Sequence, residues 1–389
     1  MQARLRAHFP GCAWALPWCG GWRLGGLGLC AVSLWLVSPP AHADEAGMGV
    51  FVRSDSDDTI VVAPRVSVAK VFNDERTRID AAYSADIWSS ASIDIRTAAT
   101  GTVTEQRDQL TAGISHDFSG VGVGASYYFS KENDYTSNGV GAFTSQRLAE
   151  GSATLEERIY LGYDSIGRSG DPGFRRDART FSGRLAYTQV FSPVTVYQFA
   201  YELIHKQGYQ ASPYRFVGLG GDGLCNGTAA LCVPEVVPDV RLRNAFVAHG
   251  RHSLSEDSSL GLGYRFYIDD WGVLSHTAIL QFAYVFGEES SLTFRYRFYT
   301  QSEADFYRAV YPLPQPGQEI VSVTRDRELS PLFSNRGALA YETLFELGST
   351  GATLRGALAV GLTTFVYADF IGLDSVYAGD VTFALTLEL

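Results

Sequence analysis

The stretch Leu292-Thr-Phe294-Arg-Tyr296-Arg-Phe298 decides the fold class of this chain. Successive side chains of a β-strand point to opposite faces, so its aromatic rings share one face and both arginines the other. The same alternation runs through Leu262-Gly-Tyr264-Arg-Phe266, Leu280-Gln-Phe282-Ala-Tyr284-Val-Phe286 and the final Val381-Thr-Phe383-Ala-Leu385-Thr-Leu387-Glu-Leu389. A soluble β-sandwich would turn an aliphatic face to its core, whereas rings at turns with charges opposite are typical of membrane barrels. We therefore predict an all-β fold, a transmembrane antiparallel β-barrel, in preference to a soluble sandwich or solenoid.

The first 43 residues predict a cleavable secretory signal. They contain three arginines and no acidic residue, then an almost wholly apolar run from Leu24 to Val37, and they end in Ala41-His-Ala43. The run has roughly 15 residues, fewer than the roughly 20 that a spanning helix needs. We expect cleavage before Asp44, which leaves residues 44–389 as a single barrel domain in the outer membrane of a Gram-negative-type cell.

Charge and cysteine content narrow the function classes. Without the three signal arginines, 28 of the 31 basic residues remain against 42 acidic ones. Such an acidic chain is an unlikely partner for nucleic acid. The signal also contains three of the five cysteines; a lipoprotein site at Cys30 is disfavoured because Leu29 precedes it. Cys225 and Cys232 remain, and in an oxidising compartment we expect a loop disulfide rather than a metal or redox-active pair.

The connections between the alternating segments differ in length, which predicts the orientation of the barrel. Short connections are expected to be periplasmic turns and long ones extracellular loops. The predicted turns lie at residues 73–75, 117–120, 149–152, 191–194, 255–258, 287–290 and 348–351. The predicted loops lie at residues 89–105, 130–138, 165–179, 208–239, 268–272, 301–335 and 372–379.

Counting between these connections predicts about sixteen strands. Fifteen fall between Thr59 and Leu389, and residues 47–53 supply the sixteenth; fourteen is the alternative if the first hairpin is not integrated. Few residues precede that hairpin, so we expect no plug domain. We expect the two largest loops, 208–239 and 301–335, to fold over or into the mouth.

Charged residues opposite the apolar face are expected to line the lumen. One interpretation is that they solvate the interior and pair across strands. The other is that the cationic stretch on strands 258–303 selects anions or holds an acidic plug. The residues predicted to line the lumen are Arg265, Arg295, Arg297, Arg355, Glu342 and Glu346.

Motifs of catalysis and metal binding do not stand out. The sequence lacks Gly-x-Ser-x-Gly, a phosphate loop, His-Glu-x-x-His and a haem-attachment motif. Asp55, Asp57 and Asp58 in the first loop are the best candidate for calcium, but a solvated acidic turn is the favoured interpretation. We therefore expect neither an enzyme nor a metal protein.

The segment from Tyr83 to Tyr163 resembles a known family. Ala85-Asp-Ile-Trp-Ser-Ser-Ala-Ser92, Ile93-Asp-Ile-Arg-Thr-Ala-Ala99, Thr104-Glu-Gln-Arg107 and Ser130-Lys-Glu-Asn-Asp-Tyr135 are similar to the outer-membrane family called domain of unknown function 3570. The resemblance implies a gene neighbourhood with a periplasmic flavin transferase, a thioredoxin-like protein and a small lipoprotein. It thus implies a role linked to envelope redox traffic, with these proteins and the outer-membrane lipid as partners.

One motif in this segment suggests a cofactor. Periplasmic flavin transferases attach FMN to a hydroxyl in the pattern Asp-x-x-Ser/Thr-Gly/Ser-Ala-Ser/Thr. Asp86, Ser89, Ser90, Ala91 and Ser92 fit this form, with Ser92 as the acceptor. A chance match in a small-residue strand end is the favoured alternative, because motifs with this much freedom recur.

The sequence is compatible with three functions. The favoured one is a non-catalytic outer-membrane conduit or scaffold, and a general porin-like diffusion channel is its close variant. The second is a flavinylated redox barrel with covalent FMN on Ser92. The third is an outer-membrane enzyme, which would need a Ser and a His brought together at the outer wall.

Overall fold

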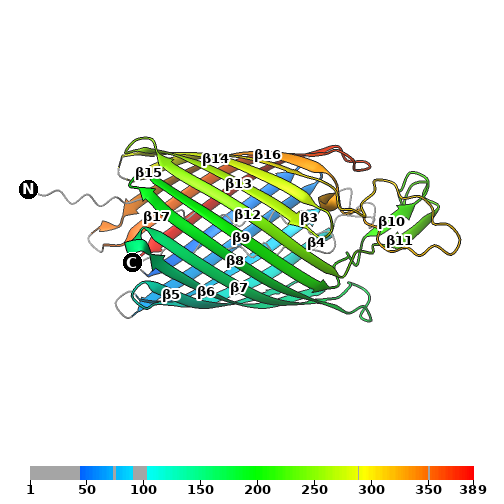
Figure 1. Cartoon of the computed structure of the whole chain (residues 1–389), viewed down its shortest axis with the longest axis horizontal. Coiled ribbons are helices and arrows are strands. Elements are labelled where there is room, and N and C mark those ends of the chain that lie inside the picture. The colour runs from blue at the N-terminus through cyan, green and yellow to red at the C-terminus, as the bar shows by residue number, and fades with distance from the viewer. Residues whose placement is uncertain (1–43, 73–75, 91–102, 288, 349–350) are drawn as a thin grey trace, which may run out of the picture.

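The computed structural model describes residues 44–72, 76–90, 103–287, 289–348 and 351–389. In this part of the chain, no helix is long and apolar enough to cross a membrane. Sixteen strands form one closed antiparallel barrel (Figure 1). In chain order they are β1 (Glu45–Asp55), β2 (Thr59–Phe72), β3 (Thr77–Ser90), β4 (Val103–Asp117), β5 (Val121–Lys131), β6 (Tyr135–Leu148), β7 (Ala153–Ile166), β8 (Arg176–Ser192), β9 (Thr195–Gly208), β12 (Val240–Ser253), β13 (Ser258–Asp269), β14 (Leu274–Phe286), β15 (Ser290–Gln301), β16 (Leu332–Glu346), β17 (Thr353–Tyr367) and β18 (Ser375–Glu388).

The first hairpin is part of the barrel, which confirms sixteen strands rather than fourteen. β1 pairs with β2 on one side and with β18 on the other, from Glu45↔Glu388 to Asp55↔Ala378. Beyond this ladder, the Leu389 N–H donates to the Asp44 carbonyl oxygen at 2.9 Å. Closure leaves no sheet edge among the barrel strands, and a closed barrel is one of the two backbone arrangements that a bilayer tolerates.

The alternation predicted from the sequence separates two faces of the wall. On β15, Phe294 and Tyr296 are 43% and 38% exposed on the outer face, and Arg295 and Arg297 lie on the inner face. The outer face is not only aromatic, because aliphatic residues such as Val140 and Leu362 are also exposed on it. This apolar exterior and polar interior are what a lipid-exposed barrel requires.

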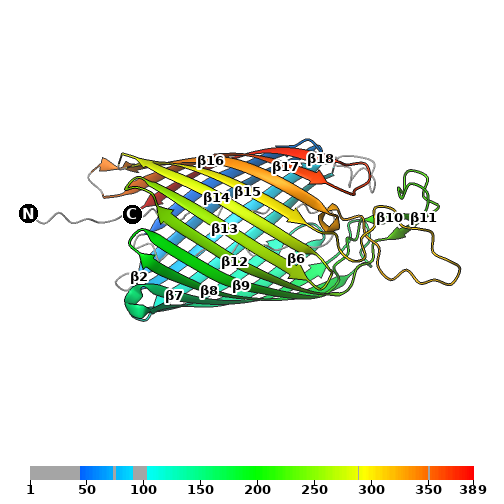
Figure 2. The same ribbon diagram turned by 45° about the horizontal axis from the view of Figure 1, so that its top comes forward.

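The two ends of the barrel differ as the connection lengths predicted. Short turns gather at the end where β1 starts and β18 finishes, and the long loops lie at the other (Figure 2). One predicted long loop, residues 130–138, is wrong. Only residues 132–134 separate β5 from β6, because the ladder continues through Ser130↔Ser137 and Lys131↔Thr136.

The loop between β9 and β12 contains a structure that the strand count did not predict. β10 (Phe216–Leu219) and β11 (Leu231–Pro234) pair as a separate two-stranded sheet. β9 pairs with β12 directly, so the loop is an insertion that leaves the barrel wall intact. The small sheet projects from the loop end, beyond the barrel strands (Figure 1).

Candidate functional site at the loop end

Two loops meet at the long-loop end and are here called the cap, residues 209–239 and 302–331. An apolar cluster joins the cap to the ends of the barrel strands and to neighbouring loops. Ala304 is completely buried within it. Because burial of apolar surface is the main favourable term in folding, this cluster holds the cap on the mouth. The buried members are Ala211, Val237, Trp271, Val273, Ala304, Tyr307, Leu329, Leu332, Tyr367, Phe370 and Val376.

The two loops of the cap are also linked by backbone pairing. Val236 and Val323 exchange hydrogen bonds of 2.8 and 3.0 Å, and Gly220 N–H donates to the Tyr311 carbonyl at 2.8 Å. The Cys225–Cys232 disulfide predicted from the sequence is present, with a Cα–Cα distance of 5.6 Å. It staples the β10–β11 loop, which confirms that prediction. The prediction that both large loops fold over the mouth is likewise confirmed.

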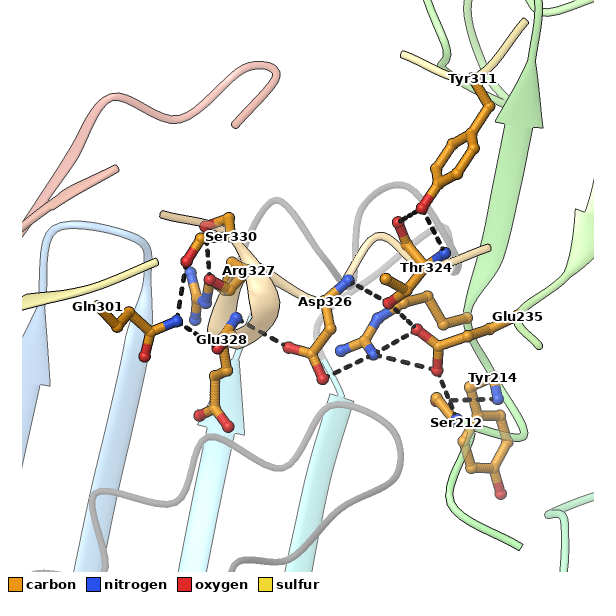
Figure 3. A network of polar contacts seen from close by, with 11 residues as sticks. Ser212, Tyr214, Glu235, Gln301, Tyr311, Thr324, Asp326, Arg327, Glu328 and Ser330 are labelled. Carbon is orange, nitrogen blue, oxygen red and sulfur yellow. Dashed lines mark hydrogen bonds and ion pairs between the residues drawn. The ribbon is translucent and has the colours of Figure 1, made fainter. Parts of the chain in front are cut away.

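A buried acid–base network joins the two loops (Figure 3). Arg215 Nη1 lies 2.9 Å from Glu235 Oε1 and 3.1 Å from Asp326 Oδ2, so one guanidinium bridges a carboxylate from each loop. Glu235 also accepts from Ser212 N–H at 2.6 Å and from the Thr324 hydroxyl at 2.5 Å. Burial raises the pKa of Glu235, and the nearby Asp326 raises it further while Arg215 opposes the shift.

The inner part of the second loop is a short 3-10 turn, η2 (Arg327–Leu329). The Asp326 carboxylate caps it by accepting the Glu328 N–H at 2.9 Å. Gln301, the last residue of β15, donates to the carbonyls of Glu328 and Ser330 at 2.7 and 2.8 Å. Arg327 is 2% exposed and donates to Asp57 of the β1–β2 turn at 2.7 Å. η2 is thus held between the end of β15 and the β1–β2 turn, four strands further round the barrel.

Asp57 corrects the interpretation of the first loop as a solvated acidic turn. Asp57 is 5% exposed and ion-paired, whereas Asp58 beside it is exposed. Asp55 accepts the backbone N–H groups of Asp57 and Thr59 and so shapes the turn. Within the described part of the chain, no group of three His, Cys, Asp or Glu residues is placed to hold a metal ion.

The inner faces of β12–β15 carry a concentration of positive charge, here called the arginine face. The inward positions of these four strands hold six arginines and one acidic residue, Asp269. Three of the predicted lumen residues, Arg265, Arg295 and Arg297, belong to it. Its members are Arg241, Arg243, Arg251, Arg265, Arg295 and Arg297.

Several inner-face arginines form ion pairs across strands. This agrees with the interpretation that the lumen charges solvate the interior and pair with one another. Arg265 Nη2 lies 2.9 Å from Glu202, and Arg336 is paired with Asp380 through two contacts. Towards the short-turn end, Arg355 contacts both Glu342 and Glu388, at 3.2 and 2.8 Å. Glu346, the last residue of β16, is exposed at that rim.

A cavity of about 130 Å³ lies between η2 and the arginine face. Arg241, Arg243 and Arg265 line it from the wall, and Asp326 and Glu328 line it from the cap. In Figure 3 the Glu328 side chain points away from the Glu235 network, towards the strands below. Its remaining lining residues are Glu202, Ile204, Asn244, Ala245, Tyr267, Val273, Ser275, Tyr299, Gln301 and Leu329.

The structure describes three residues of the predicted flavin motif, Asp86, Ser89 and Ser90. Asp86 lies on the inner face of β3 and is ion-paired with Arg107, and Gln109 donates to it at 2.7 Å. Ser89 and Ser90 pair with Thr104 and Val103 at the loop end of β3. Ala91 and the acceptor Ser92 lie outside the described residues, so the flavin prediction is neither confirmed nor contradicted.

Sequence reasoning missed the residues that organise the cap and the cavity. Arg241-Leu-Arg243 has the same alternation as Arg295-Tyr-Arg297, and this signal was available. Arg215, Glu235 and Arg327 come from loops without periodicity. Only the folded chain shows that they are buried and paired.

Comparison with known families and structures supports the fold. Residues 163–335 match the family model described as "Protein of unknown function (DUF3570)", as the resemblance predicted. The match begins where the quoted segment 83–163 ends, so it does not extend to that segment. No curated protein matches the chain.

Among solved structures, a bacterial polysaccharide outer membrane secretin is similar with a TM-score of 0.50 at 9% identity, covering 90% of this chain and 99% of the secretin. The toluene transporter TodX of P. putida has a TM-score of 0.41 at 13% identity, covering 90% of each chain. A FadL homologue from Pseudomonas aeruginosa has a TM-score of 0.42 at 11% identity, covering 90% of this chain and 92% of the homologue. These similarities concern the fold alone, which is that of an outer-membrane-type β-barrel.

Proposed function

We propose that this outer-membrane-type β-barrel is a non-catalytic conduit for small hydrophilic solutes, with the cap as its gate. The observation that carries the proposal is the contrast between the two faces of the wall. The outer face is apolar, whereas the inner face carries a dense set of charges that are connected across strands. Sixteen strands enclose an interior wide enough for water, and a polar lining keeps it wet.

The cap argues for a gated conduit over a permanently open porin-like channel. It is fixed to the wall by the apolar cluster and by η2, which reaches the arginine face. A passive scaffold needs no charged inner wall. A conduit with a closed mouth needs both this wall and a cover that moves.

Removal of the inner part of the cap tests the proposal. Ala304 N–H donates to the Leu329 carbonyl at 2.9 Å, so the two residues are already adjacent. Residues 305–328 can therefore be replaced by two glycines without separating β15 from β16. The matched control deletes Gln315–Glu319, an exposed tip of the same loop.

Single-channel recording in planar bilayers gives the readout. We expect rare, small openings for the full chain and for the tip deletion, and sustained conductance for the 305–328 replacement. If the folded replacement variant shows no conductance above that of empty bilayers, the protein is a scaffold and the proposal is wrong.

The flavinylated redox barrel stays a separate prediction, carried by Asp86, Ser89, Ser90, Ala91 and Ser92. A flavin transferase, a thioredoxin-like protein and a small lipoprotein are partners proposed on the family resemblance. Covalent FMN on Ser92 would be compatible with a conduit, so the two functions are tested independently.

A further inference from the structure

Arg243 is the most unusual side chain of the arginine face. It is 3% exposed, and its Nε and Nη2 atoms have no hydrogen-bond partner among the residues that the structure describes. Its guanidinium is hydrogen-bonded to Tyr267 and attracted by Asp269, so only these two atoms are left without a partner in the described part of the chain. Buried polar atoms that lack a hydrogen-bond partner are expensive, so they require an explanation. Arg243 lines the cavity beneath η2 and also a smaller one beside the Lys206–Asp164 ion pair.

Arg241, two residues earlier on the same inner face of β12, shows what such a guanidinium requires. Arg241 Nε and Nη2 both donate to Asp269 Oδ2, at 2.8 and 2.5 Å. These two atoms form one edge of the guanidinium, the fork that binds an oxyanion with two parallel hydrogen bonds. In Arg243, the same two atoms are the ones without a partner.

The other charged groups of the cavity already have partners. Arg265 is paired with Glu202, which is also 3.3 Å from Arg184. Asp326 is paired with Arg215. Asp269 attracts Arg243, but among the described residues its carboxylate is hydrogen-bonded to Arg241, so the Nε and Nη2 fork of Arg243 is the part of this lining suited to an added anion.

We propose that the cavity beneath η2 binds a small oxyanion through the Nε and Nη2 atoms of Arg243. Its volume of about 130 Å³ resembles that of cavities that hold one molecule of about six non-hydrogen atoms. Inorganic phosphate and small carboxylates have this size. The site deepens the proposed function, because it would place an anion where a solute passes between the cap and the arginine face.

Binding by the full chain in detergent micelles tests the site without requiring conduction. Isothermal titration with inorganic phosphate is the first arm, and sulfate and succinate distinguish a phosphate-type from a carboxylate-type ligand. We expect one saturable site for at least one of these ions. Arg243→Gln should weaken its affinity roughly tenfold or more, as loss of two charge-assisted hydrogen bonds implies.

Two further variants keep the test interpretable. Arg243→Lys retains the charge without the fork and should bind with intermediate affinity, even if the Gln variant folds poorly. Arg355→Gln removes a paired arginine at the opposite end of the barrel and should bind as the unaltered chain does.

The possible results separate this inference from the proposed conduit. The oxyanion site is overturned if none of the three ions binds at millimolar concentration, or if folded Arg243→Gln binds with unchanged affinity. Neither result affects the conduit, which the channel recordings test. If the full chain binds the ion but the 305–328 replacement shows no conductance, the oxyanion site is retained and the conduit is overturned.

Discussion

Arg327 and Asp57 are 270 residues apart in the sequence, yet Arg327 Nη1 lies 2.7 Å from Asp57 Oδ2 and both side chains are buried. The pair connects η2 of the cap to the turn between the first two strands. The β1–β2 turn holds Asp57 at the rim of the barrel, and the long loop between β15 and β16 brings Arg327 to it. This contact is the most direct structural candidate for a latch that keeps the cap closed.

Weakening the latch is predicted to loosen the cap. In Asp57→Asn, Arg327 remains buried opposite a neutral amide, and removing one partner of a buried pair typically costs about 3–5 kcal/mol. We expect more frequent channel openings and faster proteolysis within residues 302–331. Asp58→Asn is the control because Asp58 is the exposed neighbour of Asp57. Equal behaviour of the two variants would show that the pair is not a latch.

Stability of the cap is predicted to depend on pH through Glu235. Its pKa is raised by burial, so the folded cap holds the proton at pH values where the unlatched loop has lost it. The contribution of Glu235 is therefore most favourable below its ordinary value of 4.5 and declines as pH rises through the raised pKa.

Hydrogen exchange of the cap between pH 4 and 8 measures this effect, after correction for intrinsic rates. We expect protection of Thr324 and its neighbours to decrease with rising pH, and Glu235→Gln to flatten the profile. Glu319→Gln, at the exposed tip of the same loop, should leave the profile unchanged. Protection that rises with pH in the unaltered chain would contradict the assigned direction.

Adjacent residues on β16 are predicted to differ sharply in their tolerance of charge. Leu339 is 43% exposed on the outer face, and Ala340 points inward. Arginine on the lipid face of a barrel costs about 2–4 kcal/mol near the bilayer midplane, whereas lumen positions tolerate it. Urea unfolding in lipid vesicles should show Leu339→Arg destabilised by this amount and Ala340→Arg much less. The reverse order would mean that the faces are assigned wrongly.

Covalent flavin on Ser92 is predicted to be visible as added mass. Intact mass spectrometry of the protein from its native membranes, with in-gel flavin fluorescence, should show one FMN that disappears in Ser92→Ala. Ser89→Ala is the neighbouring control and should keep the adduct. A bare polypeptide mass, reduced only by the two hydrogens of the Cys225–Cys232 bridge, would rule flavin out.

The wall of the barrel was predictable because its physics is local and periodic. Alternation at Phe294, Arg295 and Tyr296 assigns both faces of β15, and turn residues between such segments give the strand count. The hairpin at residues 132–134 was predicted as too long a loop, because the polar Ser130 and Lys131 hid two further ladder pairs.

The candidate site was only partly predictable, because its residues come from distant loops. The sequence identified Arg265 and Arg297, and one of its two interpretations was a cationic wall that holds an acidic plug. It gave no signal that Arg215 bridges Glu235 and Asp326, or that Arg327 reaches Asp57. These contacts arise from tertiary packing of segments that lack any periodic pattern.

Pairing of β1 with β18 has a consequence for biogenesis. The seam joins the first and last described strands, so it is the contact of greatest sequence separation in the wall, and contacts of this kind form slowly. Until that seam zips, every partly assembled sheet has two unsatisfied edges that can pair with another chain. The factor that delivers the nascent protein to the membrane must therefore cover both unpaired edges until β18 pairs with β1.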